Sequence, residues 1–212
     1  MKKVMVIAVH PDDETLGCGG SILKHISQGD QVSVVFVTNG NTIQEKTIQR
    51  ISEAYSLNKT FKLGLKEVYL ENEPLVNIIN PLSQVISDFK PSILYIPNRS
   101  DVHSDHRSVF LAIQACTKSF RSPFLKKVLM MEVISETDFA PSLPENSFIP
   151  NIFIDISKYY ENKEKILSLY KDELLDEFQT RSISTMCALN RYRGSLINVE
   201  YAESFMLIKE II

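Results

Sequence analysis

The sequence of 212 residues is poor in several features, and each shortage excludes a class of protein. No uninterrupted apolar run reaches the roughly 20 residues of a membrane-spanning helix, and the run Val4–Val9 is too short for a signal peptide. The three cysteines have no CxxC spacing, which argues against a disulfide scaffold and predicts a reducing, cytoplasmic location. Basic residues do not outnumber acidic ones, and the formal net charge of −3 argues against nucleic-acid and membrane partners.

The hydrophobic pattern predicts one α/β domain that spans residues 1–212. Hydrophobic residues make up 44% and charged residues 23% of the chain, as in ordinary globular proteins. Short β-branched runs alternate with helical patterns, which is typical of βαβ units with a mostly parallel sheet flanked by helices. The predicted strands are Val4–Val9, Val32–Thr38, Glu67–Leu70, Ile93–Ile96, Val128–Val133, Ile152–Ile156 and Ser204–Ile208. The predicted helices are Gly17–Gln28, Thr47–Leu57, Asn77–Phe89, His103–Lys118, Ser157–Tyr170 and Ser182–Tyr192, with an irregular flap at Ser135–Asn151.

Histidine is scarce, and its placement is informative. Three of the four histidines fall in two short segments, one at His10 and one at His103 with His106. His10 follows the first predicted buried strand, and the segment Asn98–His106, which contains the other two histidines, follows the fourth. Open parallel sheets bind ligands outside the carboxyl ends of their strands, where the strand order reverses. With the order 3-2-1-4-5 of common doubly wound folds, strands 1 and 4 are neighbours, and the two segments form one site at their carboxyl ends.

The residue types in these segments are those of a catalytic metal site. The segment His10–Glu14 gathers three carboxylates and an imidazole, which would repel one another and be costly to bury without a cation. The segment His103–His106 adds two imidazoles and Asp105. Two imidazoles and one carboxylate with an open fourth position are typical of catalytic zinc, and Fe²⁺ suits the same set. Asp12 and Asp13 are adjacent and point differently, so one can bind metal while the other acts as general base on a water.

Other interpretations of these residues stay open at this point. The acidic segment could be a solvated turn with an N-capping aspartate, and the histidines could be ordinary loop and helix residues. A nucleotide-sugar-binding protein would use the Gly17–Gly20 turn and the helix N-terminus for phosphate, although the neighbouring carboxylates would repel it. A metal-dependent phosphoesterase would favour a two-metal cluster, whereas one mononuclear site accounts better for the ligand-type side chains present.

Two motifs of the chain resemble the signatures of a known family. The segments Ala8-Val9-His10-Pro11-Asp12-Asp13-Glu14 and His103-Ser104-Asp105-His106 are similar to the signature motifs of the LmbE-like, or PIG-L, family of zinc-dependent N-deacetylases. Weaker similarities are found at Thr38-Asn39-Gly40, Arg50-Ile51-Ser52-Glu53-Ala54 and Tyr201-Ala202-Glu203-Ser204-Phe205. The sequence departs from the family pattern at Gly40–Ile43, at Asp101 and within Lys165–Glu173. These departures bear on substrate contacts and leave the expected metal ligands untouched.

The resemblance implies a fold, a reaction and a set of residue roles. The implied fold is a single Rossmann-like α/β domain, and the implied reaction removes the acetyl group from an N-acetylated amino sugar, an N-acetylglucosamine-type conjugate. The implied roles are Zn²⁺ ligands for His10, Asp13 and His106, general base for Asp12, oxyanion stabiliser or acid for His103, orientation of His103 for Asp105, and sugar contact for Arg50. The small-molecule conjugate is the expected partner, and a homo-oligomer stays open.

Overall fold

The computed structural model describes residues 1–38 and 42–212. The strands are β1 (Lys3–Ala8), β2 (Gln31–Thr38), β3 (Lys59–Leu65), β4 (Ile93–Ile96), β5 (Lys127–Met131), β6 (Ile152–Asp155) and β7 (Ala202–Glu210). The helices are α1 (Asp13–Ser27), α2 (Thr42–Tyr55), α3 (Leu75–Phe89), α4 (Ser104–Cys116), α5 (Tyr160–Leu167) and α6 (Ile183–Ser195). Short 3-10 turns are η1 (Leu70–Asn72), η2 (Pro144–Asn146) and η3 (Ser168–Tyr170). Together these elements form a single α/β domain.

The strand order of the sheet is β3-β2-β1-β4-β5-β7-β6, which confirms the order predicted for the first five strands. β1 lies between β2 and β4 and is parallel to both, with Val6 opposite Val34 and Tyr95. β7 runs antiparallel to its neighbours β5 and β6, so the sheet is mostly parallel, as predicted. Because the chain moves outward from β1 to β3 and then returns to β4, the strand order reverses between β1 and β4. The carboxyl ends of these two strands therefore flank the crevice where such sheets bind ligands.

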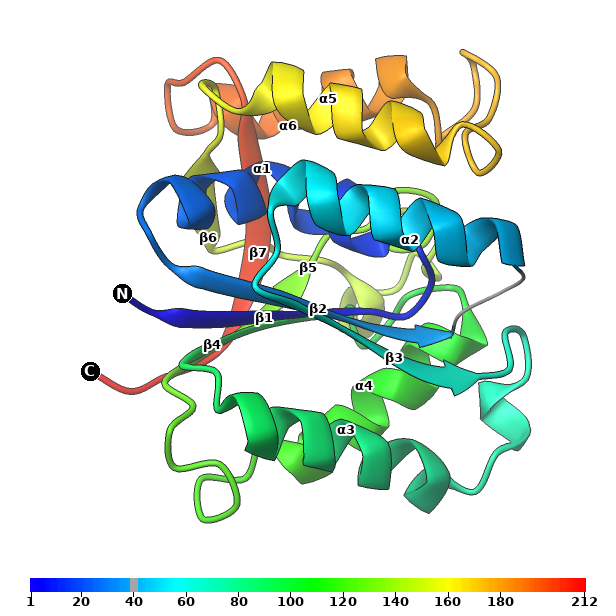
Figure 1. Cartoon of the computed structure of the whole chain (residues 1–212). Helices are drawn as coiled ribbons and strands as arrows, with labels where there is room; N and C mark the ends of the chain where they lie inside the picture. Colours follow the sequence, from blue (N-terminus) through cyan, green and yellow to red (C-terminus); the bar gives the residue numbers. More distant parts are fainter. Residues whose placement is uncertain (39–41) are drawn as a thin grey trace.

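Helices cover both faces of the sheet (Figure 1). One face carries α1, α2, α5 and α6, and the other carries α3 and α4. Alternate side chains of the first strand enter two separate cores, with Val4, Val6 and Ala8 on one face and Met5, Ile7 and Val9 on the other. This burial on both faces explains why the segment is uniformly apolar. Among the described residues, no helix combines the length and the apolar character needed to cross a membrane.

The predicted third strand, Glu67–Leu70, is wrong. The third strand is β3, which lies at the edge of the sheet and places half-buried Phe61 and Leu63 on either side of exposed Lys62. An edge strand receives little cover, so it has no uniformly apolar run, and its signal is alternation. The residues after β3 instead form a loop with Val68 at a φ of 56°, and this loop enters η1.

Two further expectations concern irregular segments. The Ser135–Asn151 segment is irregular, as predicted, and contains the turn η2. The turn Thr38-Asn39-Gly40 and the departure at Gly40–Ile43 include residues 39–41, which lie outside the described residues.

Candidate metal centre and active site

The two histidine-bearing segments meet in space at the carboxyl ends of β1 and β4. His10 follows β1, while His103 caps α4 and His106 lies in its first turn, after β4. The ring of His10 lies 4.5 Å from that of His103 and 5.3 Å from that of His106, between centroids. The fold therefore brings His10 beside His103 and His106, which lie more than 90 positions further along the sequence.

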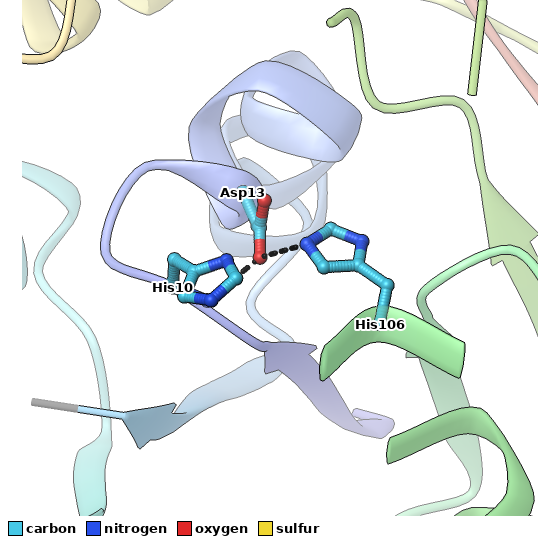
Figure 2. Close-up of side chains that lie close together, drawn as sticks. All are labelled: His10, Asp13 and His106. Atoms are coloured by element: carbon cyan, nitrogen blue, oxygen red, sulfur yellow. Dashed lines mark hydrogen bonds and ion pairs between the residues drawn. The ribbon is translucent and has the colours of Figure 1, made fainter. Parts of the chain in front are cut away.

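His10, Asp13 and His106 form a compact group that could hold a metal ion, and we call these three residues the metal group (Figure 2). One ligand atom of each residue lies within 4.8 Å of the others. The Asp13 Oδ2 accepts a hydrogen bond from the backbone N–H of His10 at 2.8 Å and lies 3.3 Å from Nε2 of His106. Asp13 opens α1, so a strand end and a helix start fix two of the three side chains, and α4 fixes the third.

The surroundings of His106 fit a divalent metal. Its side chain is buried, and its Nε2 has no hydrogen-bond partner among the described residues. The other ring nitrogen, Nδ1, lies 2.8 Å from Oδ2 of Asp101, which is the arrangement that orients metal-bound histidines. Burial lowers the pKa of His106, but Asp13 and Asp101 outweigh it and hold this pKa well above its usual range. The two carboxylates thus favour a positive charge at this imidazole, and a metal cation would supply it in place of a proton.

The remaining ligands of the group are also held in place. Burial raises the pKa of Asp13, but His106 and His10 outweigh it and keep the carboxyl well below its ordinary pKa. The Nε2 of His10 lies 3.2 Å from Oδ2 of Asp105, so Nδ1 is the nitrogen of His10 left for a metal. Asp101 and Asp105 therefore support the two candidate histidine ligands, one carboxylate for each.

The resemblance implies that Asp105 orients His103, but the carboxylate of Asp105 contacts other groups. Its carboxylate contacts His10 and accepts hydrogen bonds from the backbone N–H groups of Val68 at 2.7 Å and Leu70 at 2.9 Å. These amides come from the loop after β3, the segment mispredicted as a strand. Asp105 contacts His103 through its backbone, whose N–H donates to the His103 Nδ1 at 3.1 Å. The carboxylate is directed away because two backbone donors and one imidazole converge on it.

The hydrogen bond to His103 also assigns its tautomer. Because Nδ1 accepts, the neutral ring carries its proton on Nε2 and can donate from there. Burial lowers the pKa of His103, and the neighbouring rings of His10 and His106 lower it further, so the neutral form is favoured. His103 lines the cavity beside the metal group and is suited to donate a hydrogen bond to an oxyanion.

Asp12 is buried and has a strained backbone. Its φ of 139° lies in the region that disfavours residues with a Cβ, and such outliers persist where the surroundings fix them. Burial and the adjacent carboxylate of Asp13 raise the pKa of Asp12 well above its usual range, and the guanidinium of Arg181 opposes this shift. Arg181 Nη1 donates to Asp12 Oδ2 at 3.3 Å. A raised pKa makes this carboxylate a stronger proton acceptor than a solvent-exposed aspartate.

A buried network around Glu14 holds the strained turn. Its Oε1 accepts hydrogen bonds from Oγ1 of Thr15 at 2.5 Å and from the hydroxyl of Tyr170 at 2.8 Å. Its Oε2 accepts from the backbone N–H of Asp12 at 3.3 Å. Burial raises the pKa of Glu14 to about 7, although the two hydroxyl donors oppose the shift. Glu14 thus fixes the backbone of Asp12.

The cavity beside the metal group has room for a few water molecules, with a volume of about 60 Å³. Its lining includes His10, Asp12, Asp13, His103, Glu136 and Arg181. The guanidinium of Arg181 joins two of these carboxylates, since its Nη2 also donates to Glu136 Oε1 at 3.1 Å. Arg50, expected at the sugar, is exposed on α2 and is not among the described residues that line this cavity.

Sequence reasoning missed three residues of this site. Asp101 lies in the loop between β4 and α4, two residues before His103, and its closeness to the predicted His103–His106 motif was the available signal. Glu136 and Arg181 belong to the turn after β5 and to the segment before α6. Neither lies in a motif, and both reach the cavity because their elements pack beside the carboxyl ends of β1 and β4.

The fold and the site define a class of protein: α/β domains with a two-histidine, one-carboxylate group that could hold a metal ion at the carboxyl ends of neighbouring strands. The family described as PIG-L, GlcNAc-PI de-N-acetylase, matches residues 5–117, which is more than half of the chain. The chain belongs to this family, which confirms the resemblance seen in the two motifs.

Three relatives indicate how far the similarity extends. The chain is 24% identical to the diacetylchitobiose deacetylase of Thermococcus kodakarensis, with 100% of this chain and 85% of that protein covered. It is 23% identical to the probable N-acetyl-α-D-glucosaminyl L-malate deacetylase 2 of Bacillus cereus, with 81% and 84% covered. The solved structure of N,N'-diacetylchitobiose deacetylase from Pyrococcus horikoshii has the same fold, with a TM-score of 0.78, 21% identity, and 98% of this chain and 84% of that chain covered.

Proposed function

We propose that the protein is a metal-dependent N-deacetylase that removes the acetyl group from an N-acetylated amino sugar, an N-acetylglucosamine-type conjugate. The main support for the proposal is that Asp12 lies beside the candidate metal ligands His10, Asp13 and His106. The chain also belongs to a de-N-acetylase family. The relatives described as a diacetylchitobiose deacetylase and as a probable N-acetyl-α-D-glucosaminyl L-malate deacetylase support this substrate class. Zn²⁺ is the proposed metal, and Fe²⁺ is the alternative for the same ligands. The free cysteines support a cytoplasmic location.

The mechanism assigns a role to each residue around the scissile amide. A divalent metal held by His10, Asp13 and His106 supplies a Lewis acid for the amide carbonyl and makes a water more acidic. Asp12 accepts the proton of the attacking water as the new C–O bond forms. His103 donates its Nε2–H to the carbonyl oxygen as negative charge develops there. Asp12 then returns the proton to the amine nitrogen as the C–N bond breaks, so acetate and a free amine leave.

The test is amine release from a panel of N-acetylglucosamine conjugates by the metal-loaded protein, before and after chelation. We expect chelation to abolish release and added metal to restore it. Asp12→Asn is isosteric and should keep the metal while lowering turnover at least about 100-fold, whereas His106→Ala should lose the metal. A protein that binds no divalent metal, with His106→Ala as active as the wild type, would contradict the proposal.

The nucleotide-sugar-binding alternative receives no support from the start of α1. A phosphate there would face the buried carboxylates of Asp12, Asp13 and Glu14. It predicts nucleotide binding that chelators do not affect, and calorimetry with a nucleotide sugar, with and without chelator, distinguishes it from the deacetylase.

A further inference from the structure

The cavity beside the metal group is lined by more carboxylates than deacetylation uses. Asp12 and Asp13 have roles in the proposed reaction, but Glu67, Glu136 and Glu173 also line the cavity. They come from the loop after β3, the turn after β5 and the segment after η3, so three separate parts of the fold direct acidic side chains to one place. The mechanism leaves these three side chains unexplained.

The one arginine of the cavity lining, among the described residues, is already engaged. Arg181 is the one lysine or arginine among the described residues of the lining. Its guanidinium donates to Asp12 through Nη1 and to Glu136 through Nη2. An anionic group on a substrate would have to compete with both carboxylates for this arginine, and it would also face the charges of Glu67 and Glu173.

Glu136 lines this cavity and has one carboxylate oxygen without a hydrogen-bond partner among the described residues. The residue is 6% exposed, and its Oε2 has no hydrogen-bond partner among the described residues. The backbone of Glu136 is fixed, because its N–H donates to the carbonyl of Val133 at 3.1 Å and its carbonyl accepts from the N–H of Val102 at 3.0 Å. A buried carboxylate oxygen without a donor is costly, so a ligand N–H or O–H at this position would be stabilising.

We propose that the cavity selects N-acetylated amino-sugar conjugates that carry a free ammonium group and disfavours anionic conjugates, with Glu136 Oε2 accepting an ammonium N–H. The proposal rests on the proposed deacetylase function and specifies its substrate class. It separates this chain from the relative described as a probable deacetylase of a glucosaminyl malate, because malate carries negative charge. A partly deacetylated amino-sugar oligomer has the required chemistry, since it carries both an acetamido group and an ammonium group.

The test uses three N-acetylglucosamine β-glycosides that differ in one charged group: the 2-aminoethyl, 2-hydroxyethyl and carboxymethyl glycosides. Acetate release by the metal-loaded protein gives kcat/KM for each at neutral pH. We expect the aminoethyl glycoside to exceed the carboxymethyl glycoside by about tenfold or more, with the neutral glycoside between them. Raising the ionic strength should reduce this ratio because exposed parts of the charge interaction are screened.

Isosteric variants assign the selectivity to the proposed residue. Glu136→Gln should lower the aminoethyl-to-carboxymethyl ratio about three- to tenfold, and Glu173→Gln should change it in the same direction. Glu161→Gln, an exposed position on α5 outside the cavity, is the matched control and should leave the ratio unchanged. Thermal melting of each variant checks that it is folded.

The outcomes separate the two proposals. Failure of the metal-loaded protein to deacetylate any of the glycosides would overturn the deacetylase function and this selectivity with it. Turnover with equal rates, or with the carboxymethyl glycoside preferred, would overturn the selectivity alone. An unchanged ratio in a folded Glu136→Gln variant would remove Glu136 from the recognition of the ammonium group.

Discussion

A buried ion pair stabilises a break inside α1, and its removal should be costly. The helix departs from helical geometry at Cys18, where φ is −151° and ψ is 24°. A break of this kind leaves carbonyl groups before it and N–H groups after it without helical partners. The fully buried Nζ of Lys163 donates to the Leu16 carbonyl at 3.1 Å and to Asn190 Oδ1 at 3.1 Å.

Glu203 satisfies the other side of the break. Its Oε1 and Oε2 accept hydrogen bonds from the backbone N–H groups of Gly20 and Ser21, each at 2.8 Å. Its Oε1 also lies 2.8 Å from the Nζ of Lys163. The pair thus joins β7 and α5 to the helix whose first turn carries Asp13.

Replacing one partner should destabilise the protein by several kcal/mol. Glu203→Gln leaves the ammonium of Lys163 buried without its counter-charge, and Lys163→Met leaves the carboxylate of Glu203 without its own. Breaking a buried pair in this way costs about 3–5 kcal/mol, which corresponds to a fall in melting temperature of about 6–20 °C for a chain of this size. The double variant should be less destabilised than the sum of the single ones by about 0.5–3 kcal/mol.

Urea denaturation of the metal-loaded protein and of the two single variants and the double variant measures these free energies of unfolding. The control is the exposed pair of Lys127 and Glu210, at 3.1 Å, where Lys127→Met should cost less than about 1 kcal/mol. A buried single variant that costs less than the Lys127→Met control, or a double-variant cycle that is additive, would contradict a stabilising role for this ion pair.

Three further predictions follow from contacts elsewhere in the fold. Asp101→Asn should weaken metal binding about 10–100-fold, because this carboxylate holds the imidazole of His106, and unchanged affinity in a metal titration would contradict it. Gly20→Ala should cost about 1–3 kcal/mol in urea denaturation, since its Cβ would lie 2.7 Å from Ile156, whereas a surface change such as Gln28→Ala should cost little. Burial lowers the pKa of His25 in the folded state, so the contribution of neutral His25 to stability is present above about pH 6.5 and is lost as the pH falls through the lowered pKa. His25→Gln should therefore flatten the pH dependence of the free energy of unfolding in this range. An unaltered slope would contradict this prediction.

The hydrophobic pattern of the sequence is sufficient to predict the central strands of the sheet and the position of the site at their carboxyl ends. Uniformly apolar runs identify β1 and β4 because both faces of these strands are buried. Segments that follow such strands start at the carboxyl edge of the sheet, so the proximity of His10 and His106 was expected once strands 1 and 4 were taken as neighbours. This inference depends on local pattern and on a common strand order, and both are properties of the chain's hydrophobic periodicity.

The tertiary structure alone decided which side chains support the site. The edge strand β3 has a weak pattern because it is covered little, and its loop supplies the amides that draw Asp105 toward His10. Arg181 reaches Asp12 from a segment 169 positions away, whereas Arg50 is left exposed on its helix. Such contacts are set by how helices and loops pack against the sheet. These contacts join residues that are far apart in the sequence and share no local sequence pattern, so they could not be predicted from the sequence.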